Sequence, residues 1–173
     1  MVYGRTEMSD RFYFQEKVMG AVFQILKLSR QFFDAYPHDQ YPELMEKENR
    51  PYNCLLVEMN TYFICVPFRT EMNHNNGYHF SGSQRSVHHK SGLDYSKAVI
   101  VTNDEYISNA PGIVDKDEYN ECVQNMEKIT NAVTAYVLDY IEHRKGEKLL
   151  HEREFHRRYQ YSTLKYFEKE LGI

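Results

Sequence analysis

The chain has 173 residues, of which 42% are hydrophobic and 27% are charged, a balance typical of one soluble globular domain. Its longest apolar stretch, residues 62–68, is much shorter than the ~20 residues of a membrane span. Residues 1–7 lack the apolar segment of a secretory signal, so we expect a cytoplasmic protein with no membrane segment. The formal net charge of −4 is unusual for a nucleic-acid binder, since such proteins are generally basic.

Three cysteines, Cys54, Cys65 and Cys122, are widely spaced and form no Cys-x-x-Cys pair. Cys54 and Cys65 lie inside apolar strand patterns, where a free cysteine behaves as a small hydrophobic residue. We expect buried, reduced thiols.

The N-terminal part of the chain has a helical pattern. Ser9 and Asp10 can cap a helix, and apolar residues follow at helical spacing as far as Phe32. The pattern predicts one long N-terminal helix that ends near Tyr36, before Pro37. Residues 37–48 contain two prolines and many charges, which predicts a loop.

A β region follows. Residues 52–59 and 62–66 are apolar runs of strand length on either side of Asn60-Thr61, which predicts a hairpin. Pro67 ends the ladder or lies on an edge. Residues 69–92 are polar and rich in His, Asn, Ser and Gly, which indicates a loop of over 20 residues, and loops of that length are usually functional or disordered. Residues 98–102 predict another short strand.

The last third of the chain is helical in pattern. Asp115 or Asp117 begins a long amphipathic helix that Gly146 ends or kinks. We expect a charged helix over residues 147–158 and a last helix capped by Ser162, with Gly172 placed like a C-cap. The predicted fold class is therefore α+β, a compact antiparallel sheet with helices at both ends of a single domain spanning residues 1–173.

The polar segment after the hairpin holds the best candidates for chemistry. Arg69 offers a fixed fork of donors to a phosphate, Thr70 offers a hydroxyl donor, and His74 can exchange a proton near neutral pH. Such a set supports attack by a ribose 2′-OH on the adjacent phosphate without a metal. Motifs for P-loop nucleotide hydrolysis, zincin chemistry and the serine-hydrolase elbow are absent from the sequence.

Four histidines in this segment, His74, His79, His88 and His89, raise the alternative of a metal site. No cysteine is close to them, and adjacent His88 and His89 point in different directions on most backbones. We expect no metal and no cofactor.

Charge is unevenly distributed. Acidic residues concentrate between residues 104 and 127, whereas basic residues predominate in the middle segment and near the C-terminus. Near the C-terminus, Arg157 and Arg158 precede Tyr159 and Tyr161, a mixture found on surfaces that stack RNA bases. Ordinary solvated faces explain the same pattern equally well.

Taken in order, three segments resemble the toxins of type III toxin–antitoxin systems, the ToxN-like, AbiQ-like and TenpN/CptN-like endoribonucleases. The first runs from Arg50-Pro51-Tyr52 through a hairpin that ends in Val66-Pro67-Phe68-Arg69-Thr70, with Asn73 and His74 after it. The second is Gly92-Leu93-Asp94-Tyr95-Ser96-Lys97-Ala98-Val99, and the third is Tyr161-Ser162-Thr163-Leu164-Lys165-Tyr166-Phe167. The likeness covers residues 28–172 and is closest to the TenpN/CptN branch.

The resemblance implies a compact sheet or partial barrel similar to the MazF/Kid-like toxins. It implies cleavage of single-stranded RNA, including substrate mRNA, to 2′,3′-cyclic phosphate and 5′-hydroxyl ends. It also implies inhibition by a small repeat-derived antitoxin RNA that the toxin processes, in a closed toxin–RNA assembly, as in abortive infection and phage defence.

On this basis Arg69 and Thr70 hold the scissile phosphate, His74 acts as a general acid or base, and Lys97 is a second cation. Asp94 positions Lys97 or Tyr95. The residues expected to bind RNA are Arg50, Asn73, His79, Arg85, His88, His89, Lys90, Asp94, Tyr95 and Lys97. The ToxN branch has Thr-Ser-Pro-Lys where this chain has Arg69-Thr70-Glu71-Met72, so the lysine thought to act in catalysis is missing here.

Two other interpretations stay open. One is a non-catalytic RNA-binding module, which shares the basic and aromatic features but needs no fixed geometry at Arg69, Thr70 and His74. The other is a protein-interaction α+β domain in which the polar segment is an ordinary surface loop.

Overall fold

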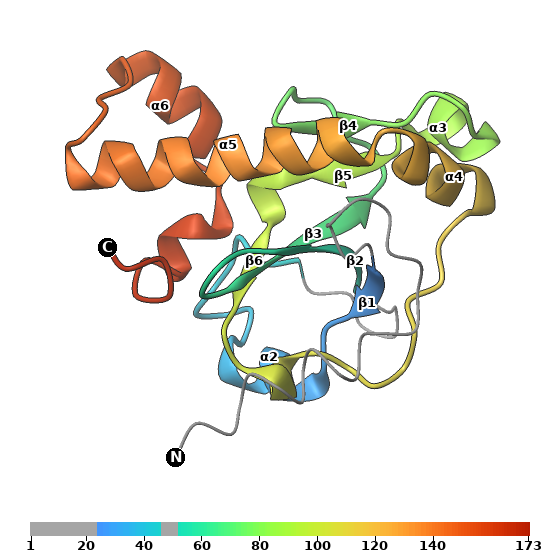
Figure 1. The fold of residues 1–173 in the computed structure, drawn as a ribbon, viewed down its shortest axis with the longest axis horizontal. Helices are drawn as coiled ribbons and strands as arrows, with labels where there is room; N and C mark the ends of the chain where they lie inside the picture. Colours follow the sequence, from blue (N-terminus) through green and yellow to red (C-terminus); the bar gives the residue numbers. More distant parts are fainter. Residues whose placement is uncertain (1–23, 46–51) are drawn as a thin grey trace.

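The computed structural model describes residues 24–45 and 52–173, which form a mixed α and β structure around one antiparallel sheet (Figure 1). The strand order is β1-β2-β3-β5-β4, and β6 also pairs with β3. The strands are β1 (Gln24–Lys27), β2 (Asn53–Glu58), β3 (Phe63–Arg69), β4 (Gly77–His79), β5 (Gly92–Asp94) and β6 (Val99–Val101).

β3 is the strand on which the sheet is built. Its first residues pair with β2 on one side and β6 on the other, and its last two, Phe68 and Arg69, pair with β5. Residues 54–57 and 64–68 are all buried, so this hairpin is covered on both faces. A continuous apolar run suits such a position, which confirms the predicted hairpin. Pro67 does not end the strand, because β3 continues through it to Arg69 and Pro67 lies in register with Cys54.

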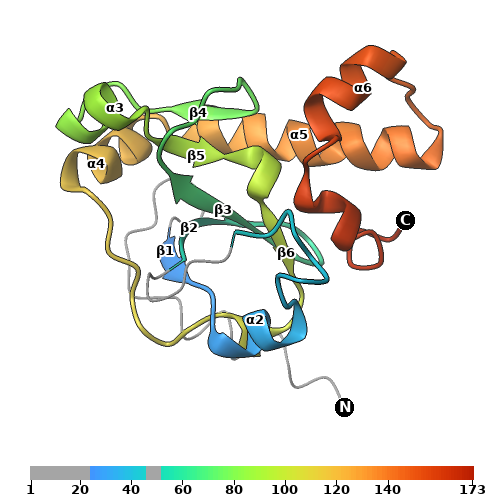
Figure 2. The ribbon, with the colours of Figure 1, turned by 180° about the vertical axis from the view of Figure 1, so that it is seen from behind.

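Helices lie around the sheet (Figures 1 and 2). The α-helices are α2 (Arg30–Ala35), α3 (Gln84–His89), α4 (Lys116–Gln124), α5 (Met126–Lys145) and α6 (Glu152–Tyr159). Single 3-10 turns follow β5 (η1, Tyr95–Lys97), follow β6 (η2, Asp104–Tyr106) and lie near the C-terminus (η3, Thr163–Tyr166). In both views α5 runs beside β4 and β5, and α6 folds back beside the far end of α5 (Figures 1 and 2).

The predicted long N-terminal helix is wrong over residues 24–29, whereas its predicted end near Tyr36 is confirmed. Residues 24–27 form strand β1, which pairs antiparallel with β2, and the helix α2 begins only at Arg30, capped by the Ser29 hydroxyl. Alternate residues of β1 are buried, which is the period of a strand with one covered face. The part of the prediction on residues 1–23 lies outside the described residues.

The C-terminal helices differ from the prediction in their boundaries. The sequence predicts one long helix from Asp115 or Asp117, but α4 ends at the C-cap Asn125 and α5 begins directly after it. Asp115 caps α4 and Gly146 ends α5 with a φ of 74°, as the sequence predicted. The charged helix is shorter than residues 147–158, and the segment capped by Ser162 is a 3-10 turn.

The predicted loop over residues 69–92 contains β4 and α3. Ser83 and Ser86 form a reciprocal capping box that starts α3. β4 and α3 are three and six residues long, and hydrophobic periodicity cannot identify elements this short from the sequence.

Carboxylates of α4 hold this segment in place. The buried Glu118 accepts hydrogen bonds from the Ser83 and Ser91 hydroxyls, and Glu121 accepts the backbone N–H groups of Ser81 and Gly82. The segment is therefore an ordered cover over one end of the sheet.

All three cysteines are free and buried, as predicted. Among the helices of the described ranges, none is both long enough and apolar enough to cross a membrane.

Candidate functional site

The site is built where β3 ends beside β5. In the ladder Phe68 lies opposite Leu93, and Arg69 lies opposite Gly92. Since side chains alternate between the two faces of a strand, Phe68 and Leu93 share the buried face while Arg69 and Asp94 share the other. The short strands thus bring two residues that are 25 positions apart in sequence onto one face of the sheet.

Asp94 is the centre of the polar contacts. Its side chain is fully buried, and its Oδ2 accepts from Arg69 Nη1 at 2.6 Å and lies 3.3 Å from Nε2 of His74. Its Oδ1 accepts from the backbone N–H and the hydroxyl of Ser96, at 3.0 and 2.6 Å. A buried carboxylate needs such compensation, and here every partner is a donor.

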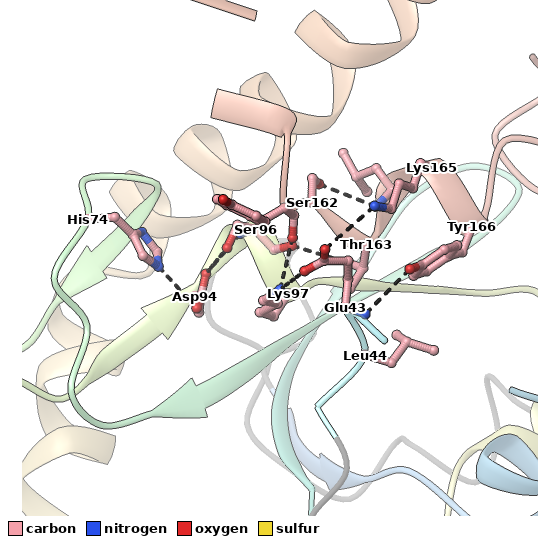
Figure 3. Close-up of polar contacts among 12 residues, drawn as sticks. Glu43, Leu44, His74, Asp94, Ser96, Lys97, Ser162, Thr163, Lys165 and Tyr166 are labelled. Atoms are coloured by element: carbon pink, nitrogen blue, oxygen red, sulfur yellow. Dashed lines mark hydrogen bonds and ion pairs between the residues drawn. The ribbon is translucent and has the colours of Figure 1, made fainter. Parts of the chain in front are cut away.

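Arg69 and His74 connect this buried carboxylate to solvent. Their side chains are 34% and 35% exposed. An arginine has five N–H donors, so Arg69 can keep its bond to Asp94 and still donate to a second anion from solvent. The cluster of Arg69, His74 and Asp94 is the candidate site (Figure 3 shows His74 and Asp94).

The hydrogen bonds of His74 fix its tautomer. The backbone N–H of Asn76 donates to Nδ1 at 3.2 Å, so Nδ1 carries no proton and Nε2 donates to Asp94. Both ring nitrogens are therefore engaged, and the ring as placed is a neutral hydrogen-bond donor. This bears on the acid–base role expected of His74, because protonating Nδ1 displaces the Asn76 N–H.

Met72 anchors the segment that carries His74 by packing against β4 and β5. Met72 is buried, and a Cβ atom at Gly77 or Gly92 would lie under 3.0 Å from its side chain. The two glycines thus leave room for Met72 on β4 and β5. Met72 is therefore a packing residue.

Other residues of this loop are tied to α3. Glu71 has a φ of 56°, its N–H donates to the His89 carbonyl, and its carboxylate lies 3.3 Å from His89 Nδ1. Lys90 donates to the Asn73 side chain at 2.8 Å. Thr70 is half-buried directly after Arg69. The predicted residues Asn73, His89 and Lys90 thus lie together at the margin of the site.

Lys97 is placed differently from the prediction. Its ammonium donates to Glu43 at 2.8 Å and to the Tyr161 carbonyl at 2.9 Å, and its side chain is 12% exposed. Figure 3 shows Lys97 directed toward Glu43, which also lies near Lys165. Asp94 contacts Arg69 and His74 and not Lys97, so Lys97 is a charge-paired link between chain segments.

The remaining predicted residues fall into four groups. Tyr95 is buried and packs against Tyr136, and burial raises its pKa well above the ordinary value. Arg85 lies 3.6 Å from the buried Glu118, whereas His79 and His88 are exposed. Arg50 lies outside the described residues.

The C-terminal aromatic and arginine pattern is largely structural. Arg158 pairs with Asp139 at 3.0 Å and lies over the rings of Tyr136 and Tyr159, and Tyr159 is buried. Tyr161 is exposed.

Sequence reasoning missed Asn76 and Ser96. Asn76 supplies the N–H that sets the His74 tautomer, and its side chain donates to the Arg158 carbonyl at 3.3 Å. Ser96 completes the donors around Asp94. The role of Ser96 is signalled in the sequence by the Asp-x-Ser spacing from Asp94, which is typical of a side-chain cap, whereas no pattern signals the role of Asn76.

The chain matches no protein-family model, no curated protein and no solved structure. Within residues 24–45 and 52–173, no three His, Cys, Asp or Glu side chains are placed together so as to hold a metal ion.

Proposed function

We propose that the chain is an endoribonuclease that cleaves single-stranded RNA by attack of a 2′-OH on the adjacent phosphate, without a metal. One observation carries the proposal. Arg69 and His74, each about one third exposed, are held side by side on the buried carboxylate of Asp94. Arg69 has N–H donors beyond the one that Asp94 accepts, and fixed donors stabilise the negative charge that grows on a phosphate during transfer.

In this reaction Arg69 donates to a non-bridging oxygen of the scissile phosphate while Asp94 keeps the guanidinium oriented. His74 keeps its Nε2–H on Asp94 as a neutral imidazole, because its Nδ1 lone pair is occupied by the Asn76 N–H, and so helps to hold the carboxylate that orients Arg69. Thr70, next to Arg69, supplies a hydroxyl donor. The products are a 2′,3′-cyclic phosphate and a 5′-hydroxyl.

The more specific identity rests on the sequence resemblance to type III toxin–antitoxin toxins. It supplies the MazF/Kid-like architecture, the cytoplasmic location, the small repeat-derived antitoxin RNA and the closed assembly. The polar face at Arg69 and His74 is where that RNA and the substrate mRNA would bind.

Cleavage of a long transcript of mixed sequence, with mapping of the product ends, tests the proposal. We expect cyclic-phosphate and 5′-hydroxyl ends at recurring short sequences, in the presence and absence of a chelator. Arg69→Ala should lower the rate about 100- to 1,000-fold, the usual cost of removing one such donor. Arg30→Ala is the matched control, because Arg30 is 93% exposed and pairs only loosely with Asp34.

Intact RNA recovered with the protein would overturn the cleavage proposal in favour of a non-catalytic RNA-binding module. Purification from the native locus tests the toxin assignment separately. A stoichiometric short repeat RNA is expected there, and a preparation free of RNA would argue for an interaction domain.

A further inference from the structure

The sheet places one more histidine on the face that carries Arg69. Gly92 of β5 lies opposite Arg69 of β3 on one side and opposite His79 of β4 on the other. Residues in register across a sheet point to the same face, so Arg69 and His79 flank Gly92 with no side chain between them on that strand. They lie two strand spacings apart, roughly 10 Å between backbones.

The tautomer of His79 is also fixed. Its Nε2 lies 2.8 Å from the backbone carbonyl of His74, and a carbonyl oxygen can only accept. Nε2 therefore carries the proton, and Nδ1 carries the lone pair when the ring is neutral. Among the described residues none makes a hydrogen bond to this Nδ1, and the residue is exposed.

The two histidines of the site thus differ in what they can do. His74 loses a hydrogen bond from Asn76 when it takes a proton, and in the neutral form it has no lone pair to spare. His79 takes a proton on Nδ1 without breaking any bond, and its bond to the His74 carbonyl strengthens when the ring is charged. Of the two rings, His79 is the one arranged as a base.

Resting on the proposed function, we propose that His79 is the general base of the cleavage reaction. Its Nδ1 takes the proton of the 2′-OH as the 2′ oxygen bonds to phosphorus. The bond from phosphorus to the 5′ oxygen breaks, that oxygen takes a proton from water, and His79 later returns its proton to solvent. His74 contributes the backbone carbonyl that orients this base, and its Nε2–H holds the carboxylate of Asp94.

Charged groups around His79 set the conditions for this step. Arg69 from β3 and Asp94 from β5 share its sheet face, and His74 and Glu71 come from the loop between β3 and β4. Lys90 and His89 come from the end of α3, where the His89 carbonyl accepts from the Glu71 N–H. The charges of Arg69 and Asp94 offset each other, and the carboxylate of Glu71 lies 3.3 Å from Nδ1 of His89.

The test is the pH dependence of single-turnover cleavage by the full chain, compared among three variants. The wild-type rate should fall with unit slope on the acid side, over the range in which histidines titrate. His79→Ala should cost about 100-fold or more and lose that slope, and added imidazole should restore part of the rate. His74→Ala should lower the rate and keep the slope. His156→Ala, an exposed histidine of α6, should match the wild type.

Nitrogen-detected NMR of the histidine rings gives a readout without RNA. We expect His79 as the Nε2–H tautomer with an Nδ1 that takes up the titrating proton. An Nδ1–H tautomer at His79, or a His79→Ala enzyme that keeps its acid slope, would overturn the assignment. Wild-type protein that does not cleave RNA would instead refute the proposed function, and the base assignment with it.

Discussion

At the scale of single residues, the candidate site depends on Asp94. Four donors from three residues converge on its fully buried carboxylate, and they come from the end of β3, from the following loop and from η1. Removing the charge leaves the Arg69 guanidinium without its partner, and one amide oxygen cannot replace two carboxylate oxygens. Asp94 therefore both positions the side chains of the candidate site and stabilises the fold at the edge of the sheet.

We predict that Asp94→Asn lowers the free energy of unfolding by about 2 to 3 kcal/mol, the worth of hydrogen bonds to a charged group. Urea unfolding followed by circular dichroism measures it. Asp34→Asn is the control, because Asp34 is 69% exposed and its contact with Arg30 is 3.9 Å long, so a change below about 0.5 kcal/mol is expected. Equal stability of the two variants would mean that the Asp94 contacts do not hold the fold.

The residue scale also shows where sequence reasoning succeeds. Arg69 and His74 stand out because their chemistry is readable from residue type and from a polar segment after a buried strand. Asp94 is also a candidate from the sequence, but it is expected there to position Lys97 or Tyr95. Its contact with Arg69 and His74 could not be predicted, because Asp94 is 20 to 25 positions away and only the pairing of β3 with β5 brings it close. The sequence predicts Lys97 as a second cation of the site for the same reason, since the carboxylate that neutralises it, Glu43, lies 54 positions upstream in the sequence.

At the scale of elements, prediction succeeds where burial leaves a long pattern. The β2–β3 hairpin is apolar over its length because both faces are covered, and Asp115 and Gly146 mark helix ends by their own chemistry. β1 has four residues, too few to separate a strand period from a helical one. β4 and β5 have three residues each and are stabilised mainly by pairing with neighbouring strands, so the sequence alone could not reveal them.

The packing of α6 against α5 gives a prediction that depends on pH. Asp139 of α5 accepts from Arg158 of α6 and from Lys148 in the connection, both at 3.0 Å. Burial alone would raise the pKa of Asp139, but the hydrogen bonds and charges of Lys148 and Arg158 outweigh it and lower that pKa. A carboxyl group with a lowered pKa in the folded state stabilises the fold above its unfolded pKa and loses that contribution as the pH falls.

Asp139→Asn should therefore lower the free energy of unfolding by about 1 kcal/mol at pH 7, the upper range for a partly exposed ion pair. The difference from the wild type should shrink as the pH falls from about 4 toward 2, as the wild-type carboxylate takes up its proton. Denaturant unfolding at several pH values measures both quantities. A difference that stayed constant with pH would show that the charge of Asp139 is not what joins α5 to α6, and Asp39→Asn, at an exposed turn, supplies the baseline.

At the scale of the whole molecule, the acidic composition is partly internal. Glu118 is buried and paired with Arg85, and Glu121 accepts the backbone N–H groups of Ser81 and Gly82. These carboxylates attach residues 80–91, which cover one end of the sheet, to α4. They therefore contribute less to the electrostatic field outside the protein than their number suggests. A formal charge of −4 is therefore a poor guide to the local charge around Arg69.

The three cysteines report whether the molecule unfolds as one unit. Cys54 and Cys65 lie in β2 and β3, Cys122 lies in α4, and all are fully buried. The pKa of Cys54 is raised by the neighbouring Cys65 thiol and by burial. Burial, together with Glu118 and Glu121, raises the pKa of Cys122 from 9.0 to about 12. Fewer thiolates at neutral pH mean slower reaction, roughly 1,000-fold for a shift of this size.

We predict that the native protein resists iodoacetamide at pH 7 and that all three thiols become reactive over the same range of urea concentration. Cys54, Cys65 and Cys122 belong to one buried hydrophobic cluster, so we expect a single cooperative transition in which thiol exposure coincides with loss of the circular dichroism signal. Pulsed alkylation followed by peptide mass spectrometry measures each site separately. Reaction of Cys122 at urea concentrations that leave Cys54 and Cys65 protected would show that α4, with the cover it anchors, unfolds before the sheet. The site at Arg69 and Asp94 would then lie next to a unit that opens independently.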